Sequence, residues 1–433
     1  MNVRRIAPLL VALVVAATTS GCSETQDPAA TGTTVATGAG HCDEASLVEC
    51  ARRSILAHVV PDATGPAEGE PILIGMVNQE NTPAGSYPEL SAAATAAVEF
   101  VNEELGGIHG RPIRLEVCNT EFSAEGSTSC GQRFVEEGAV AVLGGIDVFG
   151  NAIDVLDDND IPYVGGIPVS DRSVTAPNSF QFSGGTWGAA VAFADHAVKS
   201  GAERVAVVYG DFGSIADAAE VGRRVLERSG AEVQMVPYPI IATDLSATLA
   251  AATADDPDAI FVLAADTGCR AGFDGLHALG VRATKYFVGA CASPAITEQA
   301  GNDATEGIVF NVEGPVRPED PSADQQLYDG VIAKYGSAGL DPIGAGTVSF
   351  RAFMNLYRIL AGLDGDPAPA KVIAALGQQV GTPSFAGHPY TCDRQQFTDL
   401  PAMCAPQQIL TEMHDGTLRQ IGDWVDVGAI ERG

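Results

Sequence analysis

The residues that could carry out catalysis in this 433-residue chain do not form a familiar catalytic pattern. The patterns GxSxG, HExxH, GxxxxGK[ST] and GxGxxG, which mark acyl transfer, zinc hydrolysis and phosphate or dinucleotide binding, do not occur in the sequence. Its seven histidines are scattered, without the helical spacing of metal ligands, and the acidic run at 157–160 lacks the periodic ligands of a calcium loop. We therefore expect no enzyme, metal or cofactor, with a hydrolase assembled from distant groups as the alternative.

The cysteines are the next residues with chemistry of their own. Setting Cys22 aside leaves eight of the nine cysteines, an even number without the CxxC spacing of a zinc site. They fall into local pairs, and an oxidising compartment would let disulfides persist. Buried free thiols are the alternative. The predicted disulfides are Cys42–Cys50, Cys118–Cys130, Cys269–Cys291 and Cys392–Cys404.

The N-terminus has the features of an export signal. Arg4 and Arg5 precede an apolar run at 6–17, which is shorter than the about 20 residues that span a bilayer. The run leads to residues 19–22, Thr-Ser-Gly-Cys, which resemble a bacterial lipobox with Cys22 as the lipidated residue. An ordinary cleaved signal is the alternative. We predict a lipoprotein signal peptide at 1–22, a flexible tether with a local disulfide at 23–70, and an extracytoplasmic protein anchored to the outer face of the cytoplasmic membrane.

The charge balance restricts the class of partner. The chain has 55 acidic and 24 basic residues, a formal net charge of −31. Such a charge disfavours binding to nucleic acid or to an anionic membrane surface. We therefore expect no nucleic-acid partner, and the charge indicates nothing more specific about the ligand.

From residue 71 onward, short apolar runs alternate with amphipathic segments, which is typical of strand–helix–strand units in a parallel sheet. The first set has expected strands at 72–77, 113–117, 140–143 and 162–165, and expected helices at 89–105, 131–137 and 151–157. The run at 72–77 has no polar alternation, as expected for a strand buried on both faces.

The pattern then restarts with the same order. This second set has expected helices at 187–199, 216–228, 245–252 and 272–279, and expected strands at 204–209, 233–238, 259–264 and 285–288. The remainder has an expected strand at 307–313, helices at 322–335, 347–363 and 370–376, and a β-rich tail at 385–427. We predict two Rossmann-like, doubly wound α/β lobes joined by a three-strand hinge, with 71–185 plus 309–384 in lobe 1 and 186–308 plus 385–433 in lobe 2.

The order and spacing of these segments resemble a known family. Together with the lipobox and the tether, residues 72–78, 140–145, 161–164, 204–212, 259–264 and 306–309 are similar to the type I periplasmic binding fold. The likeness covers residues 71 to about 425 and is nearest to the leucine/isoleucine/valine-binding receptors of ABC importers, in their actinobacterial lipoprotein form. It implies a monomeric solute-binding protein that holds an amino acid, branched-chain amino acids included, between closing lobes and delivers it to ABC permease subunits.

The resemblance also implies which loops bind the ligand. In the first lobe they are the loops after the strands, and glycines at the carboxyl ends of parallel strands independently favour a ligand there. Tight turns alone are the alternative reading of those glycines. The first-lobe candidates are Asn78, Gly145, Asp147, Val148, Phe149, Gly165, Gly166 and Ile167.

In the second lobe the candidates are Thr186, Trp187, Tyr209, Phe212, Asp266 and Thr267, and a place in the lobe core is the alternative for the aromatic residues. In the amino-acid receptors a carboxylate near position 266 pairs with the ligand's ammonium group, and here Cys269 and Arg270 stand close to where it would align. Asp266 is therefore the candidate substitute, with a solvated loop carboxylate as its alternative.

Two other functions stay open. The chain could be a receptor that signals ligand occupancy to a membrane partner, because the same lobe closure serves transport and sensing. Its ligand could also be an amide, a urea or a small organic acid, because this fold does not determine the ligand.

Overall fold

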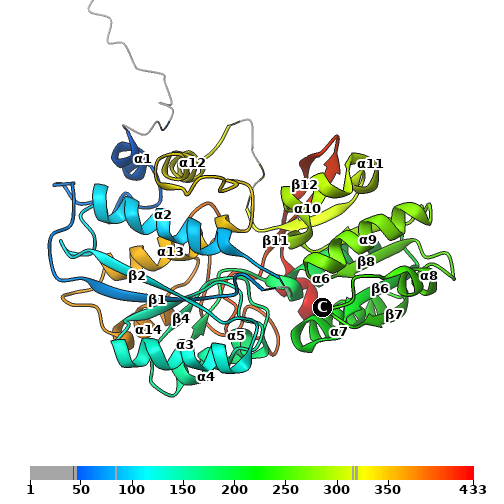
Figure 1. The fold of residues 1–433 in the computed structure, drawn as a ribbon, viewed down its shortest axis with the longest axis horizontal. Helices are drawn as coiled ribbons and strands as arrows, with labels where there is room; N and C mark the ends of the chain where they lie inside the picture. Colours follow the sequence, from blue (N-terminus) through cyan, green and yellow to red (C-terminus); the bar gives the residue numbers. More distant parts are fainter. Residues whose placement is uncertain (1–41, 43–45, 83–84, 315, 317–319) are drawn as a thin grey trace, which may run out of the picture. The chain divides into compact units, whose positions relative to one another are not determined.

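Two separate sheets, one in each predicted lobe, organise the chain (Figure 1). The computed structural model describes residues 42, 46–82, 85–314, 316 and 320–433. The predicted signal peptide, Cys22 and the first part of the predicted tether lie outside these residues. The α/β fold class and the two-lobe architecture are confirmed.

The first sheet is parallel throughout, with strand order β2-β1-β3-β4-β5. All seven residues of the central strand β1 are buried, as its uninterrupted apolar run predicts. The strands are β1 (Ile72–Asn78), β2 (Ile113–Asn119), β3 (Ala141–Gly144), β4 (Tyr163–Val164) and β5 (Ser179–Phe180).

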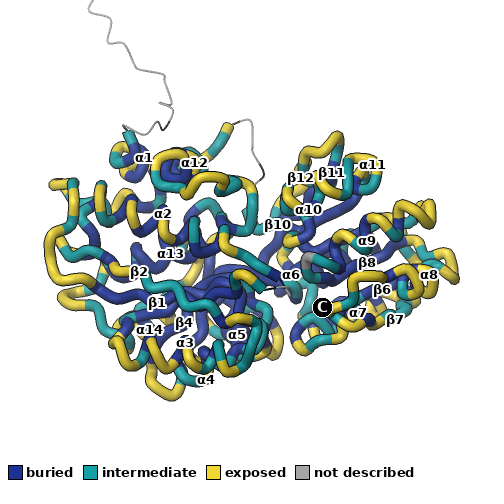
Figure 2. Tube along the Cα trace, viewed as in Figure 1, coloured by how far each residue is buried: buried dark blue, intermediate teal, exposed yellow. Residues whose placement is uncertain are grey.

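Helices cover both faces of this sheet, so its strands are buried (Figures 1 and 2). One face packs on α2 and α13 through residues such as Phe100 and Phe353, and the other packs on α3 and α4 through Phe134 and Leu156. The helices of this lobe are α1 (Leu47–Arg53), α2 (Pro88–Glu104), α3 (Ala124–Glu137), α4 (Asn151–Asp157), α5 (Asp171–Thr175), α12 (Ala323–Tyr335), α13 (Gly346–Ala361) and α14 (Pro369–Gly377).

The second sheet repeats the winding of the first and adds a hairpin. Its parallel part has the order β7-β6-β8-β9-β10, which matches β2-β1-β3-β4-β5, and β11 and β12 extend it antiparallel. The strands are β6 (Arg204–Gly210), β7 (Glu232–Tyr238), β8 (Ala259–Leu263), β9 (Thr284–Phe287), β10 (Val309–Val312), β11 (Gln408–His414) and β12 (Thr417–Val425).

The helices of the second lobe pack in two groups around one apolar core. The first group is α6 (Gly185–Lys199), α7 (Gly213–Arg228) and α15 (Val427–Arg432). The second group is α8 (Ser246–Ala252), α9 (Asp266–Ala278), η1 (Gly289–Ala292), α10 (Pro294–Ala300) and α11 (Asn302–Thr305). The core contains Phe193, Phe261 and Tyr286, which contact one another.

The prediction of a tether that extends to residue 70 is wrong for its C-terminal part. Helix α1 (Leu47–Arg53) packs on α12, and Leu47 and Leu56 are at most 1% exposed in the core of the first lobe. The buried carboxylate of Asp324 also accepts a hydrogen bond from the Ile55 N–H at 2.9 Å. The folded lobe thus includes this segment, because its apolar residues can be buried where those of a tether cannot.

The predicted boundary between the lobes also needs correction. Strand β10 pairs with β9 and β11 in the second sheet, so residues 309–312 belong to the second lobe. Conversely, Phe385, Tyr390 and Ala405 pack in the core of the first lobe. The chain crosses between the lobes after β5, after β10 and before β11, and the predicted three-segment hinge is confirmed.

Some predicted elements have different limits. Helix α3 begins at Ala124, because Ser123 caps it by accepting the Gly126 N–H at 2.9 Å. Helix α9 begins at Asp266, six residues before the predicted start. The predicted β-rich tail is wrong for 385–407, where no strand longer than an isolated bridge forms.

The structure contains the four predicted disulfides. Cys118 in β2 joins Cys130 in α3, and Cys269 in α9 joins Cys291 in η1, so these two bridges link a strand to a helix and a helix to the next turn. In the chain-entropy model, a bridge that closes a loop of this size stabilises the fold by about 3 kcal/mol.

Candidate functional site

A cleft of about 1240 Å³ lies between the two sheets. Residues that follow parallel strands of both lobes line it: Ile146 after β3, Ile167 after β4, Ile240 after β7 and Ala265 after β8. Ligands of open α/β sheets bind beyond the carboxyl ends of the strands. The geometry therefore makes this cleft the candidate binding site.

Five of the predicted site residues line this cleft. From the first lobe they are Val148 and Ile167, and from the second lobe Thr186, Phe212 and Thr267. The fold brings these residues to one cavity from loops that lie far apart in the sequence, because Val148 and Thr267, about 120 positions apart, both line it. That they contact a solute stays a prediction.

Asn78 supports the cleft wall from behind. Its side chain is buried, donates to the Tyr87 carbonyl at 2.8 Å and to Glu80 Oε1 at 3.0 Å, and accepts the Ile146 N–H at 3.0 Å. These bonds use both ends of the amide. Asn78 therefore positions Tyr87 and Ile146, which line the cleft, and does not line it itself.

Asp147 is also turned away from the cleft. Its buried carboxylate accepts hydrogen bonds from Ser127 Oγ at 2.7 Å and from the Gly150 N–H at 3.2 Å. Burial raises the pKa of Asp147, although these hydrogen bonds oppose the shift. The side chain holds the turn between β3 and α4.

The predicted glycines serve close packing and turns. A Cβ at Gly145 would lie 2.4 Å from Asn78 Oδ1, and one at Gly165 would lie 2.2 Å from the Cβ of Ala352 on α13. Gly165 and Gly166 also have φ values of +67° and +88°, which favour glycine. The surroundings of these glycines therefore favour the alternative interpretation, in which they serve tight turns.

The remaining second-lobe candidates lie outside the lining or beyond description. Trp187 is 2% exposed and lies in the core of the second lobe, which was the alternative given for the aromatic residues. Tyr209 is half-buried in β6 and does not line the cleft. Asp266 begins α9, whose next residue Thr267 lines the cleft, but its side chain lies outside the described part of the structure.

Three phenylalanine rings meet beside the cleft, where Phe122 and Phe212 line it and the predicted site residue Phe149 contacts both rings without lining it. Phe122 and Phe149 of the first lobe lie 5.4 Å apart between ring centroids, and Phe212 of the second lobe lies 6.4 Å and 6.0 Å from them. Phe122 and its neighbour Glu121 have φ values of 51° and 53°, a left-handed conformation that side chains rarely adopt. Such strain persists only where the surroundings impose it, and it is concentrated at functional sites.

Two isoleucines with unusual exposure also line the cleft. Ile241 of the second lobe is 71% exposed, and Ile343 of the first lobe is 41% exposed. Further closure of the lobes would remove the exposed apolar surface of both side chains from water. Burial of such surface contributes about 25 cal/mol per Å², which favours closure.

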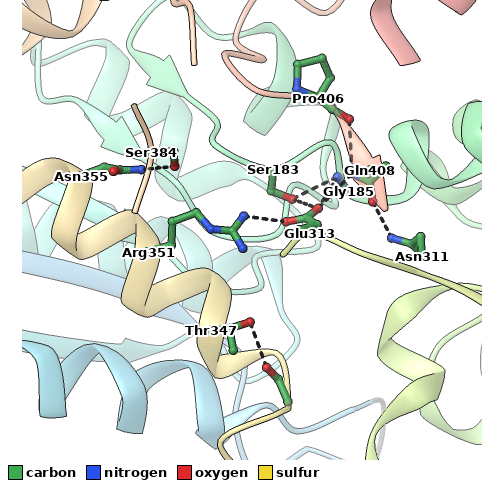
Figure 3. A network of polar contacts seen from close by, with 11 residues as sticks. Ser183, Gly185, Asn311, Glu313, Thr347, Arg351, Asn355, Ser384, Pro406 and Gln408 are labelled. Carbon is green, nitrogen blue, oxygen red and sulfur yellow. Dashed lines mark hydrogen bonds and ion pairs between the residues drawn. The ribbon is translucent and has the colours of Figure 1, made fainter. Parts of the chain in front are cut away.

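Glu313 joins the three crossover segments at the hinge (Figure 3). Its Oε1 atom accepts hydrogen bonds from Ser183 Oγ at 2.5 Å, the Gly185 N–H at 3.3 Å and Gln408 Nε2 at 3.3 Å. Arg351 of α13 faces the other oxygen, with Nη1 3.8 Å from Oε2. Glu313 and Arg351 both line the cleft, so the hinge and the candidate site share residues.

Sequence reasoning missed Phe122, Glu313 and Arg351. A signal existed for Arg351, which interrupts an otherwise apolar stretch of the helix predicted at 347–363. No local pattern marks Glu313 or the left-handed backbone at Phe122, because both depend on contacts with distant segments.

The described residues contain no helix that is both long and apolar enough to span a bilayer. Over the same ranges, no group of three or more histidine, cysteine, aspartate or glutamate side chains is placed to hold a metal ion.

Two wound sheets, a three-segment hinge and a cleft lined from both sides define a bilobal ligand-binding protein. Residues 71–403 match the family model described as periplasmic binding protein, and the chain belongs to this family. The family consists of ligand-binding proteins with an extracytoplasmic location. A comparison with curated proteins gave no significant match.

Solved structures show the same fold. A leucine-binding protein from Thermotoga maritima has a TM-score of 0.68 at 16% identity, covering 81% of this chain and 98% of that one. A possible leucine/isoleucine/valine-binding protein from Rhodopirellula baltica has a TM-score of 0.71 at 13% identity, covering 82% and 98%. A solute-binding protein from R. palustris, solved with 4-hydroxybenzoate, has a TM-score of 0.68 at 18% identity, covering 81% and 96%. The resemblance to the type I periplasmic binding fold of the leucine/isoleucine/valine-binding family is thereby confirmed.

Proposed function

We propose that this protein is an extracytoplasmic solute-binding lipoprotein that captures a small polar molecule between its lobes and delivers it to an ABC importer. The observation that carries the proposal is the cleft, to which both sheets contribute residues. A solute that contacts both lobes stabilises the closed arrangement, and closure is the signal that a membrane partner can read. Binding without catalysis fits the absence of a catalytic motif in the sequence.

Amino acids, branched-chain ones included, are the first ligand class to test, because one structural neighbour is described as a leucine-binding protein and another as a possible leucine/isoleucine/valine-binding protein. Aromatic acids are the second, because another neighbour holds 4-hydroxybenzoate. Phe122 and Phe212, which line the cleft, could pack against either an aliphatic or an aromatic body.

The test is thermal unfolding of the full chain, extracted in mild detergent, against amino acids, amides, ureas and organic acids. A ligand at about 100 times its dissociation constant adds about 2.7 kcal/mol to the stability. A shift with one compound class would support a solute-binding function and name its class. No shift with any class would remove the support for it.

Delivery and anchoring need their own tests. Co-purification of permease subunits with the liganded protein would support import, and a two-component sensor in their place would support the sensing alternative. Replacing Cys22 with alanine should release the protein from the membrane, and unchanged membrane retention would contradict lipidation. Light scattering of the released protein should show a monomer.

A further inference from the structure

Arg351 is a buried arginine on the wall of the cleft. It lies in the second turn of α13, whose residues from Val348 to Tyr357 are all buried. The arginine is 4% exposed, and it lines the cleft together with Thr347 and Val348 of the first turn. A guanidinium at this depth needs partners, because a buried charge without hydrogen bonds is costly.

The described residues do not supply those partners. Among these residues, the only ion-pair contact of the guanidinium is the 3.8 Å approach of Nη1 to Glu313 Oε2, which is too long for a hydrogen bond (Figure 3). Nε is enclosed without a hydrogen-bond acceptor among the same residues, and so is Glu313 Oε2 without a donor. Glu313 thus compensates the charge of Arg351 in part, while the guanidinium N–H groups have no hydrogen-bond acceptor among the described residues.

Aspartate and glutamate residues outnumber the single cation among the described lining residues, so Arg351 is the one charged lining side chain that can pair with an anion. Among the described residues that line the cleft, Arg351 is the only arginine, lysine or histidine. The N-terminus of the 16-residue helix α13 also reaches the cleft, and a helix N-terminus carries a partial positive charge. Burial lowers the pKa of Arg351 and Glu313 raises it, but an arginine stays charged at physiological pH.

Two glycines leave space around the guanidinium. A Cβ at Gly387 would lie 2.9 Å from Arg351 Nε, and a Cβ at Gly314 would lie 3.3 Å from Nη2. Neither glycine has a positive φ, so the backbone conformation does not require glycine at these positions. The missing side chains instead leave room for the guanidinium.

We propose that Arg351 binds the carboxylate of the solute, and that the solute is a small acid with one negative charge and an apolar body. This inference rests on the proposed solute-binding function and names the class of its ligand. The planar fork of a guanidinium matches the two oxygens of a carboxylate. The neighbouring Glu313 disfavours a second negative charge, and the lining by Val148, Ile167 and Phe212 suits an apolar body.

The experiment compares acids with their own amides. The probes are leucine and leucinamide, 4-methylpentanoate and 4-methylpentanamide, and 4-hydroxybenzoate and 4-hydroxybenzamide. Each is titrated into the full chain in mild detergent by thermal unfolding and calorimetry. We expect the tightest-binding acid to exceed its amide by at least about 30-fold in affinity, since the amide cannot offer the charge-assisted pair.

Two outcomes would overturn the inference. One is an amide that binds as tightly as its acid, which would leave the solute-binding function intact. The other is the failure of every acid to bind, and if neutral and cationic compounds also fail, the solute-binding function falls as well. The two proposals can therefore fail separately.

Variants assign the effect to this residue. Arg351→Gln should reduce the acid-to-amide ratio to about 1, and Arg351→Lys should keep a reduced preference for the acid because it keeps the charge. Arg358→Gln is the matched control, because it removes the same charge from the same helix and its guanidinium bonds to the Pro383 carbonyl outside the cleft lining. A wild-type ratio in a folded Arg351→Gln protein would contradict the assignment. If Arg351→Gln does not fold, Arg351→Lys decides, and an unchanged acid affinity there would contradict a bidentate contact.

Discussion

The ring of Phe149 lies 6.0 Å from the ring of Phe212, edge to face, and this contact joins the first lobe to the second. Phe149 follows β3 of the first sheet and Phe212 follows β6 of the second, so each ring comes from a loop after a parallel strand. Aromatic pairs contribute about 0.5–1.5 kcal/mol beyond the area that they bury. Phe212 therefore both lines the cleft and contacts the first lobe.

Replacing Phe212 with alanine should weaken solute binding about 10-fold, because it removes both a cleft wall and the contact with Phe149. Calorimetry with the solute found in the thermal screen measures the change. Leu279→Ala is the control, since Leu279 is 48% exposed and does not line the cleft. An affinity within about twofold of the wild type would contradict the role of Phe212.

Asp266→Asn should weaken the binding of a cationic or zwitterionic solute by more than about 10-fold, equivalent to about 1.4 kcal/mol. The reason is the loss of a carboxylate at the start of α9, whose next residue Thr267 lines the cleft. Calorimetry measures it, with Asp274→Asn as the control, because Asp274 is an exposed carboxylate of the same helix. Equal affinities for the two variants would reject an ammonium contact at Asp266.

Glu313→Gln should lower the free energy of unfolding by about 3 kcal/mol, because it leaves Arg351 buried without a compensating charge. Adding Arg351→Met should restore a large part of this loss, since the double variant has no buried charge at the hinge. Urea unfolding of the two single variants and the double variant measures the coupling. Strictly additive effects would show that the two side chains are energetically independent.

Replacing both Cys42 and Cys50 with serine should cost about 2–3 kcal/mol, because the disulfide closes a short loop at the start of the folded lobe. Leu47 and Leu56 pack against the lobe on either side of Cys50. We therefore expect faster amide hydrogen exchange in α1 and unchanged exchange in β1. Glu49→Gln, at an exposed position of the same helix, should leave both rates unchanged. Protection of α1 that survives loss of the disulfide would show that packing alone holds the helix.

The stability should fall slightly as the pH rises above about 6.5, because hydrogen bonds to Glu306 and then Glu412 raise the pKa of His414 above its ordinary value. A raised pKa in the folded state means that the charged form is the stabilised one. This contribution is complete below the unfolded pKa and is lost as the pH passes the folded one. Melting temperatures from pH 5 to 9 for the wild type and His414→Gln measure it. Parallel curves for the two proteins would exclude His414 as the source.

Local patterns determined much of the fold. The alternation of apolar runs and amphipathic segments reports which faces are buried, so two wound sheets and the three crossovers between the lobes could be expected from the chain. The short separations within the cysteine pairs likewise made local disulfides the natural expectation, and the structure has them. The loops after strands that the sequence singles out contribute Val148, Ile167, Phe212 and Thr267 to the cleft.

Tertiary structure decided which side chains face the cleft. Asn78 and Asp147 have the polar groups of a binding site, yet hydrogen bonds to Tyr87, Ile146, Ser127 and Gly150 turn them inward. Arg351 becomes a cleft residue only because α13 packs across the first lobe and the crossover after β10 brings Glu313 to it. Such contacts join segments far apart in sequence, and hydrophobic periodicity carries information about the buried face of an element but not about which distant element will cover it.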